Sequence, residues 1–157
     1  MKLFEKKQDN RGFSLVELII VIAIMAILVG IVGTQVIPYL NKSREAKDLQ
    51  IISSYSTAAV TAYAENAEKF AALEQAGTNV TIKVYSAESA DPKKTWQADI
   101  ITLSGYDDDA ALKAAMSSKK GSSITDVKIE IDWAAKTITA TGQDASGDIL
   151  EPCVSHI

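Results

Sequence analysis

Gly12–Gly33 reads GFSLVELIIVIAIMAILVGIVG, and Glu17 is the only charged residue within it. No lysine or arginine follows until Lys42. About 20 apolar residues, at a rise of roughly 1.5 Å per helical residue, match the ~30 Å hydrocarbon core of a bilayer. The stretch therefore predicts one membrane-spanning helix. Residues 1–12 before it are rich in lysine and arginine, which predicts that they stay in the cytoplasm and that the rest lies outside.

A helical pattern continues beyond the apolar stretch. Between residues 49 and 73, mainly apolar residues recur at steps of three and four, so they share one face of a helix. They are Leu49, Ile52, Tyr55, Ala59, Ala62, Tyr63, Asn66, Phe70 and Leu73. Charged residues, Asp48 among them, fall mostly outside this stripe, and Gly77 is a natural helix stop. We expect one long helix over residues 13–75.

The remainder of the chain has the pattern of a small antiparallel sheet. Apolar and polar residues alternate over Asn79–Tyr85 and, most regularly, over Val127–Trp133. Lys136–Thr141 follows after a short turn, which predicts a hairpin. The apolar faces of these strands need a cover, and the stripe on residues 49–73 is the obvious partner. The sequence thus predicts an α+β fold in which a small antiparallel sheet packs on a helical spine.

The other segments of this region are less regular. Asp107–Asp109 precedes an apolar run and predicts an acidic cap on a short helix. Residues 86–98 look irregular, with Asp91-Pro92 marking a turn. We expect a short strand or a turn at 100–103 and an edge strand at Ile149-Leu150.

Three interpretations of the N-terminal segment compete. An ordinary secretory signal peptide has a shorter apolar region and an A-x-A-like cleavage site after it, whereas here the helical pattern continues. A plain membrane anchor accounts for the length and the basic flank but not for Glu17. A carboxylate inside an apolar span costs a few kcal/mol and is a functional hypothesis by default, unless it lies close enough to the interface to stay hydrated.

The third interpretation uses all of these features together. Gly12-Phe13-Ser14-Leu15-Val16-Glu17, behind a basic leader, resembles the processing site of type IV prepilins. The resemblance covers residues 11–32 strongly and the following helix loosely. It implies that prepilin peptidase cuts after Gly12, that Phe13 becomes the N-methylated first residue, and that Glu17 is the assembly glutamate.

Elementary electrostatics explains that spacing. Cleavage after Gly12 leaves an ammonium group on Phe13 at the end of an apolar helix. Packing such helices together removes the ammonium from water, which is prohibitive unless an opposite charge pairs with it. Glu17 of a neighbouring copy supplies that charge, and the pair fixes the axial register because any other register leaves charges unpaired.

The resemblance also implies the organisation of the chain. It predicts a leader peptide at 1–12, a transmembrane and later filament-core helix at 13–40, and a pilin head at 41–157 that contains an amphipathic helix at 41–75 and a sheet region at 78–157. The expected partners are copies of the same chain, prepilin peptidase, the pilus assembly machinery in the membrane and, before assembly, membrane lipid. The expected location is a single-pass membrane state, then a surface pilus.

Two other functions stay open. Within the same family, the chain fits a pseudopilin of a type II secretion or DNA-uptake system as well as a pilus subunit for adhesion or motility, since the leader is similar in both. From another class, a membrane-anchored binding module that never polymerises predicts an unprocessed N-terminus and no dependence on Glu17.

The helix has one expected weak region. Gly30 and Gly33 are poor helix formers, and Pro38 removes a backbone donor and clashes near Thr34. A mild kink is one expectation. By resemblance, type IV pilin helices often unwind in this region on assembly, which makes local melting between Gly30 and Pro38 the other.

Composition argues against other classes of function. A formal net charge of −4 gives no basic surface for nucleic acid, and no catalytic constellation or cofactor motif occurs, so no enzyme and no cofactor are expected. Asp144 and Asp148 are weak candidates for a cation, although a polar turn explains them better. The lone Cys153 excludes an intrachain disulfide; many Gram-negative major pilins close a C-terminal loop with one, so its absence favours a Gram-positive source.

Overall fold

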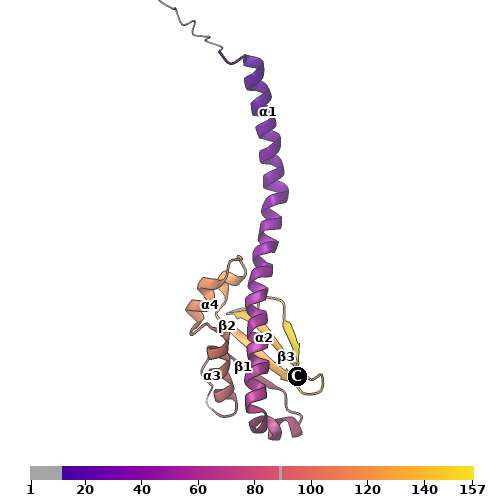
Figure 1. The fold of residues 1–157 in the computed structure, drawn as a ribbon, viewed down its shortest axis with the longest axis vertical. Helices are drawn as coiled ribbons and strands as arrows, with labels where there is room; N and C mark the ends of the chain where they lie inside the picture. Colours follow the sequence, from indigo (N-terminus) through magenta and orange to yellow (C-terminus); the bar gives the residue numbers. More distant parts are fainter. Residues whose placement is uncertain (1–11, 89) are drawn as a thin grey trace, which may run out of the picture. The chain divides into compact units, whose positions relative to one another are not determined.

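The computed structural model describes residues 12–88 and 90–157 (Figure 1). The chain divides into two compact units, one ending at Leu40 and the other comprising Asn41–Ile157. The predicted leader, apart from Gly12, lies outside the described residues.

From Leu15 onward, the first unit is helical. Helix α1 covers Leu15–Ile31, a π-helical turn η1 covers Val32–Val36, and helix α2 begins at Ile37. None of the α1 side chains is buried. In length and composition, the helical residues Leu15–Gln75 contain a stretch that suits a membrane span, and none of that stretch is buried.

The π-helical turn lies where the sequence predicts a weak region. Pro38 has no backbone N–H, and its ring would collide with the carbonyl of Thr34 in a regular helix. Instead, the N–H of Ile37 donates to the carbonyl of Val32, five residues back, which widens the turn. Gly30 and Gly33 stay helical. In the single chain the disturbance is thus a widened turn, and melting on assembly stays a prediction.

Helix α2, Ile37–Gln75, provides the spine of the second unit. Its buried face includes Ile52, Tyr55, Ala59, Ala62, Asn66 and Phe70, with Leu49, Tyr63 and Leu73 half-buried beside them. The predicted stripe is therefore confirmed. The helix ends two residues before Gly77, which has φ 63°, and the N–H of Gly77 and of Thr78 donate to the carbonyls of Glu74 and Leu73 at 2.9 and 3.2 Å. This pair of bonds is the Schellman motif.

We expect Gly77→Ala to lower the free energy of unfolding of the second unit by about 1 kcal/mol, because a Cβ disfavours positive φ. Urea unfolding of the full chain in detergent, followed by tryptophan fluorescence, measures this, since both tryptophans lie in the second unit. Gly77→Asn is the matched control and should lose less, because asparagine tolerates this conformation. Equal stability of the alanine variant and the native chain would contradict the prediction.

The second unit contains one antiparallel sheet of five strands, β1 Val80–Lys83, β2 Asp126–Asp132, β3 Thr137–Asp144, β4 Gly147–Asp148 and β5 Cys153–His156. The order is β1-β2-β3, and both β4 and β5 pair with β3. The predicted hairpin is confirmed, with Ile129 opposite Ala140 and Ile131 opposite Ile138. Figure 1 shows α2 running alongside these strands. The predicted α+β fold is therefore confirmed.

Helix α3, Lys93–Ser104, corrects two predictions. Residues 93–98 are not irregular, and residues 100–103 form neither a strand nor a turn. Trp96 and Ile100 are one helical turn apart, and both are fully buried. The indole N–H of Trp96 donates to the carbonyl of Ala59 at 3.0 Å, and this ties α3 to α2. The Asp91 side chain accepts from the N–H of Thr95, so the Asp-Pro pair precedes a helix start.

The C-terminal region corrects a third prediction. Ile149-Leu150 is not an edge strand. The side chain of Leu150 is buried in the core, and the strand lies further on, at β5. The predicted short acidic-capped helix is confirmed as α4, Asp109–Ala115, where Asp108 accepts from the N–H of Ala111 at 2.6 Å.

Candidate functional site

The predicted cleavage site is accessible in the described chain. Gly12 and Phe13 precede α1, lie outside regular structure and are exposed, Phe13 by 86%. A Cβ added at Gly12 would meet nothing within 4 Å, and Gly12 has no positive φ. The packing of the chain itself therefore gives no reason for glycine here.

Glu17 has a local partner in the single chain. The N–H of Ser14 donates to Glu17 Oε2 at 2.8 Å, and Ser14 Oγ accepts from the N–H of Val16 at 3.3 Å. Ser14 is the N-cap of α1, and the two residues form a capping box. Sequence reasoning missed this role of Ser14, although the spacing Ser14-Leu15-Val16-Glu17 is the known signal for it.

The capping box sharpens the question about Glu17. Capping requires an acceptor at this position, and glutamine serves as well as glutamate. Pairing with an ammonium group requires the negative charge. The two roles are therefore separable by substitution.

The apolar surface of the first unit is large and uncovered. Its big apolar side chains are about half exposed or more, among them Ile20, Met25, Val29 and Ile37. Soluble monomeric proteins rarely expose contiguous apolar patches beyond a few hundred Å². This surface therefore needs lipid or other apolar helices around it.

Comparison with protein families explains these features. Residues 7–33 match the family model described as the prokaryotic N-terminal methylation motif. The chain is type IV pilin-like. The match includes Gly12, Phe13 and Glu17 and ends before the second unit begins. The motif implies processing by prepilin peptidase followed by assembly, and the apolar helix is consistent with membrane anchoring of the precursor.

The comparisons add nothing about the second unit. No curated protein and no solved structure matches the chain. Pilin-like proteins with this motif are typically structural and non-enzymatic. The fold supports the likeness, because an apolar-started helix packed on an antiparallel sheet is the pilin-like arrangement.

The two cation candidates in the second unit are occupied by protein donors. Asp144 Oδ1 accepts from the N–H of Ser146 at 2.6 Å, which closes the turn between β3 and β4. Asp148 accepts from Gln143 Nε2 at 2.6 Å and from Lys128 Nζ at 3.2 Å. The hydrogen bond from Gln143 is the largest cause that holds the pKa of Asp148 below its usual value, and the Lys128 ammonium acts in the same direction. Across residues 12–88 and 90–157, no group of three or more His, Cys, Asp or Glu residues is placed to hold a metal ion.

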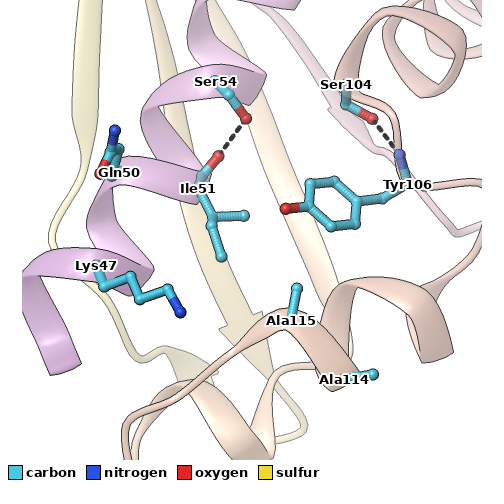
Figure 2. Close-up of a pocket in the computed structure, with 8 residues that line it drawn as sticks. All are labelled: Lys47, Gln50, Ile51, Ser54, Ser104, Tyr106, Ala114 and Ala115. Atoms are coloured by element: carbon cyan, nitrogen blue, oxygen red, sulfur yellow. Dashed lines mark hydrogen bonds between the residues drawn. The ribbon is translucent and has the colours of Figure 1, made fainter.

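An open groove of about 680 Å³ lies on the second unit, and Figure 2 shows its lining. Helix α2 contributes Lys47 and Ser54, α4 contributes Ala115, and Tyr106 follows α3. The ring of Tyr106 stacks on that of Tyr55, with centroids 6.0 Å apart. The lining contains no carboxylate, histidine or thiol. This groove therefore has no pair of groups suited to acid–base or nucleophilic chemistry.

Proposed function

We propose that the chain is a structural subunit of a type IV pilus. In this proposal it is cut after Gly12, methylated on Phe13 and polymerised through residues 13–40 into a surface filament for adhesion or motility. One observation carries the proposal. An uncovered apolar helix has a single charged residue, Glu17, at the fifth position after a glycine that the chain's own packing does not require.

The chemistry of assembly follows from that geometry. Cleavage replaces the peptide nitrogen of Phe13 by an ammonium group, two residues before α1 begins at Leu15. When apolar helices pack together, this charge loses its water and needs a negative partner. Glu17 of an adjacent copy supplies it and gives up its bond to Ser14, or shares it. The pair selects one axial register among many that apolar contacts alone would allow.

The weak region of the helix belongs to the same proposal. The π-helical turn Val32–Val36 lies between Gly30 and Pro38, where the regular hydrogen-bond ladder is already interrupted. Melting of this region costs fewer regular bonds than melting elsewhere in the span. We therefore place the local unwinding on assembly between Gly30 and Pro38.

The leader, core helix and head, at 1–12, 13–40 and 41–157, are the corresponding functional parts. The pilus assembly machinery and neighbouring copies of the chain are the proposed partners, and the lone Cys153 favours a Gram-positive source. A pseudopilin of a secretion or DNA-uptake system shares the N-terminal motif. Electron microscopy of cells decides between them, because long filaments that contain this chain support a pilus and short periplasmic or wall-spanning fibres a pseudopilin.

The direct test is mass spectrometry of the chain in material sheared from the cell surface. The expected result is a mature N-terminus at Phe13, with one added methyl group. Gly12→Val is the matched variant, and it should leave the leader attached because the peptidase requires the glycine. A mature N-terminus at Phe13 in that variant would refute the site. An intact leader on the native chain would favour a membrane anchor that never polymerises.

A further inference from the structure

We propose that a ring of basic side chains at the start of the second unit binds the phosphate groups of anionic phospholipids at the membrane surface. The ring, called the basic collar below, consists of Lys42, Arg44, Lys47, Lys119 and Lys120. The proposal goes beyond assembly. It rests on membrane insertion of the precursor, and not on whether the chain later polymerises.

Three members of the collar lie on α2. At 3.6 residues per turn, Arg44 and Lys47 lie about 200° and 140° around the helix from Lys42. All three side chains are exposed. Arg44 and Lys47 therefore share the side of the helix opposite Lys42, and the three cations lie on two sides of α2 within two helical turns. Where such a helix leaves a bilayer along its normal, charges close to the end of the span lie near the headgroups.

The loop after α4 adds the other two members. Asp48 of α2 accepts from the N–H groups of Ser117 and Ser118 at 2.7 and 2.9 Å, which fixes this loop against the helix. Lys120 Nζ then lies 3.6 Å from Glu45, and Lys119 is exposed beside it. The fold thus brings cations from two segments, more than 70 residues apart, to the same turns of α2.

The collar is a positive region on an acidic unit. Residues 41–157 contain 12 lysines and arginines against 17 aspartates and glutamates, and the collar holds five of the 12. The carboxylates near the collar are Glu45, which pairs with Lys120, and Glu151. Asp48 is fully buried and used by the loop. Positive charge therefore exceeds negative charge here, while the reverse holds for the rest of the unit.

The position of the collar selects a lipid over other anions. Along the chain, Lys42 follows Leu40 by two residues, Arg44 by four and Lys47 by seven. The headgroup layer extends several Å beyond the hydrocarbon core, and long basic side chains reach back to it. Tyr39, exposed by 77%, has the amphipathic ring typical of that interface.

Three collar members, Lys42, Lys119 and Lys120, line two hollows with room for a headgroup. An open hollow of about 370 Å³ is lined by Asn41, Glu45, Ser118, Lys119 and Lys120. A second hollow of about 260 Å³ adjoins it through Lys120 and Glu45 and includes Lys42 and the apolar Leu49 and Leu150. Ammonium groups lie beside polar or apolar neighbours in both hollows, with Glu45, the partner of Lys120, in both and Glu151 in the second. This combination suits a phosphate with an attached glycerol.

The test reconstitutes the full chain in phosphatidylcholine vesicles with spin-labelled phosphatidylglycerol or spin-labelled phosphatidylcholine. Electron paramagnetic resonance measures the fraction of each label immobilised by the protein, and hence their relative association constants. We expect several-fold preference for phosphatidylglycerol at 20 mM salt, and a weaker preference at 500 mM because salt screens exposed charges. Neutralising Lys42, Arg44 and Lys47 to glutamine should lower the preference about threefold or more.

The matched control neutralises Lys83, Lys94 and Lys113 to glutamine. These side chains are also exposed, and the change in net charge is identical, but they lie outside the collar. The control should keep the native preference. The leader, with its own basic residues, is present in every variant, so the difference between variants reports the collar alone.

The outcomes separate the possibilities. An equal loss in both variants, or no preference in the native chain, overturns the collar as a lipid site. If the collar variant changes association between labelled copies in pure phosphatidylcholine, with lipid preference unchanged, the collar binds another copy and the lipid proposal is wrong. A chain that fails to float with vesicles contradicts the membrane span itself, which is a failure of the proposed function and not of the collar.

Discussion

Glu17→Gln should abolish filament assembly while leaving leader cleavage and the folded second unit unchanged. The substitution keeps the side-chain oxygen that accepts from the N–H of Ser14, so the capping box of α1 survives. It removes only the negative charge. If that charge pairs with the Phe13 ammonium of a neighbouring copy, each contact between subunits then contains a buried, unpaired cation.

The expected size of this effect is large. Breaking a buried ion pair by removing one partner costs about 3–5 kcal/mol. Such a loss weakens each subunit contact by roughly two to four orders of magnitude. Quantifying the chain in sheared surface material and in the membrane fraction measures it. We expect the variant to accumulate as a processed, membrane-bound subunit.

Two matched variants make the result specific. Glu65→Ala removes an exposed carboxylate from α2 and should leave assembly intact. Glu17→Ala removes both the charge and the acceptor for the N–H of Ser14, so it should fail at least as severely as Glu17→Gln. Normal piliation in Glu17→Gln, together with a defect in Glu17→Ala, would mean that Glu17 acts only as a helix cap.

The difference between these two roles shows how far sequence reasoning reaches at this site. The apolar run and the position of Glu17 predict the helix and single out the carboxylate, because both depend on local pattern. The spacing of Ser14 and Glu17 is that of a capping box, so the sequence contains the information that identifies Ser14 as the N-cap. The pairing partner of Glu17 belongs to another copy of the chain, so neither the sequence nor a single chain contains its geometry.

The second unit shows a different limit of prediction from sequence. The stripe from Ile52 to Phe70 and the β2–β3 hairpin follow from periodicity, and both are confirmed. The sequence pattern does not predict helix α3, because Asp91-Pro92 alone indicates a turn. Trp96 and Ile100 become recognisable as one helical face only once α2 is packed against them. Strand β5 is four residues long and depends on pairing with β3, a contact between segments distant in the sequence.

Asp48 is the clearest case in the second unit where the sequence pattern predicts the wrong environment. The helical pattern places it among the charged residues outside the apolar stripe, where solvent is expected. The structure buries it completely. The reason is tertiary, because the loop after α4 folds over this position and presents its backbone N–H groups to the carboxylate.

Asp48→Ala should lower the free energy of unfolding of the second unit by about 3 kcal/mol. The carboxylate accepts from the N–H of Ser117, from the hydroxyl of Ser117 at 3.0 Å, and from the N–H of Ser118. Hydrogen bonds to a charged group contribute about 1.5–3 kcal/mol each, and their loss leaves buried donors without partners. Urea unfolding of the full chain in detergent, followed by the fluorescence of Trp96 and Trp133, measures the change.

The same carboxylate makes stability depend on pH, and Asp48→Asn isolates that dependence. Burial alone would raise the pKa of Asp48, but the hydrogen bonds from Ser118 and Ser117 outweigh it and hold the pKa below its usual value of 3.8. A carboxyl whose pKa is lower in the folded state stabilises the fold above its unfolded pKa, and this contribution disappears as the pH falls through the folded pKa.

We therefore expect the difference in stability between the native chain and Asp48→Asn to be constant from pH 7 to about 5 and to shrink below pH 4. Gly121 adds an independent check, because a Cβ there would meet the Asp48 carboxylate, so Gly121→Ala should destabilise the same loop at neutral pH. A difference between the native chain and Asp48→Asn that stays unchanged down to pH 2 would show that Asp48 contributes through packing and not through its charge.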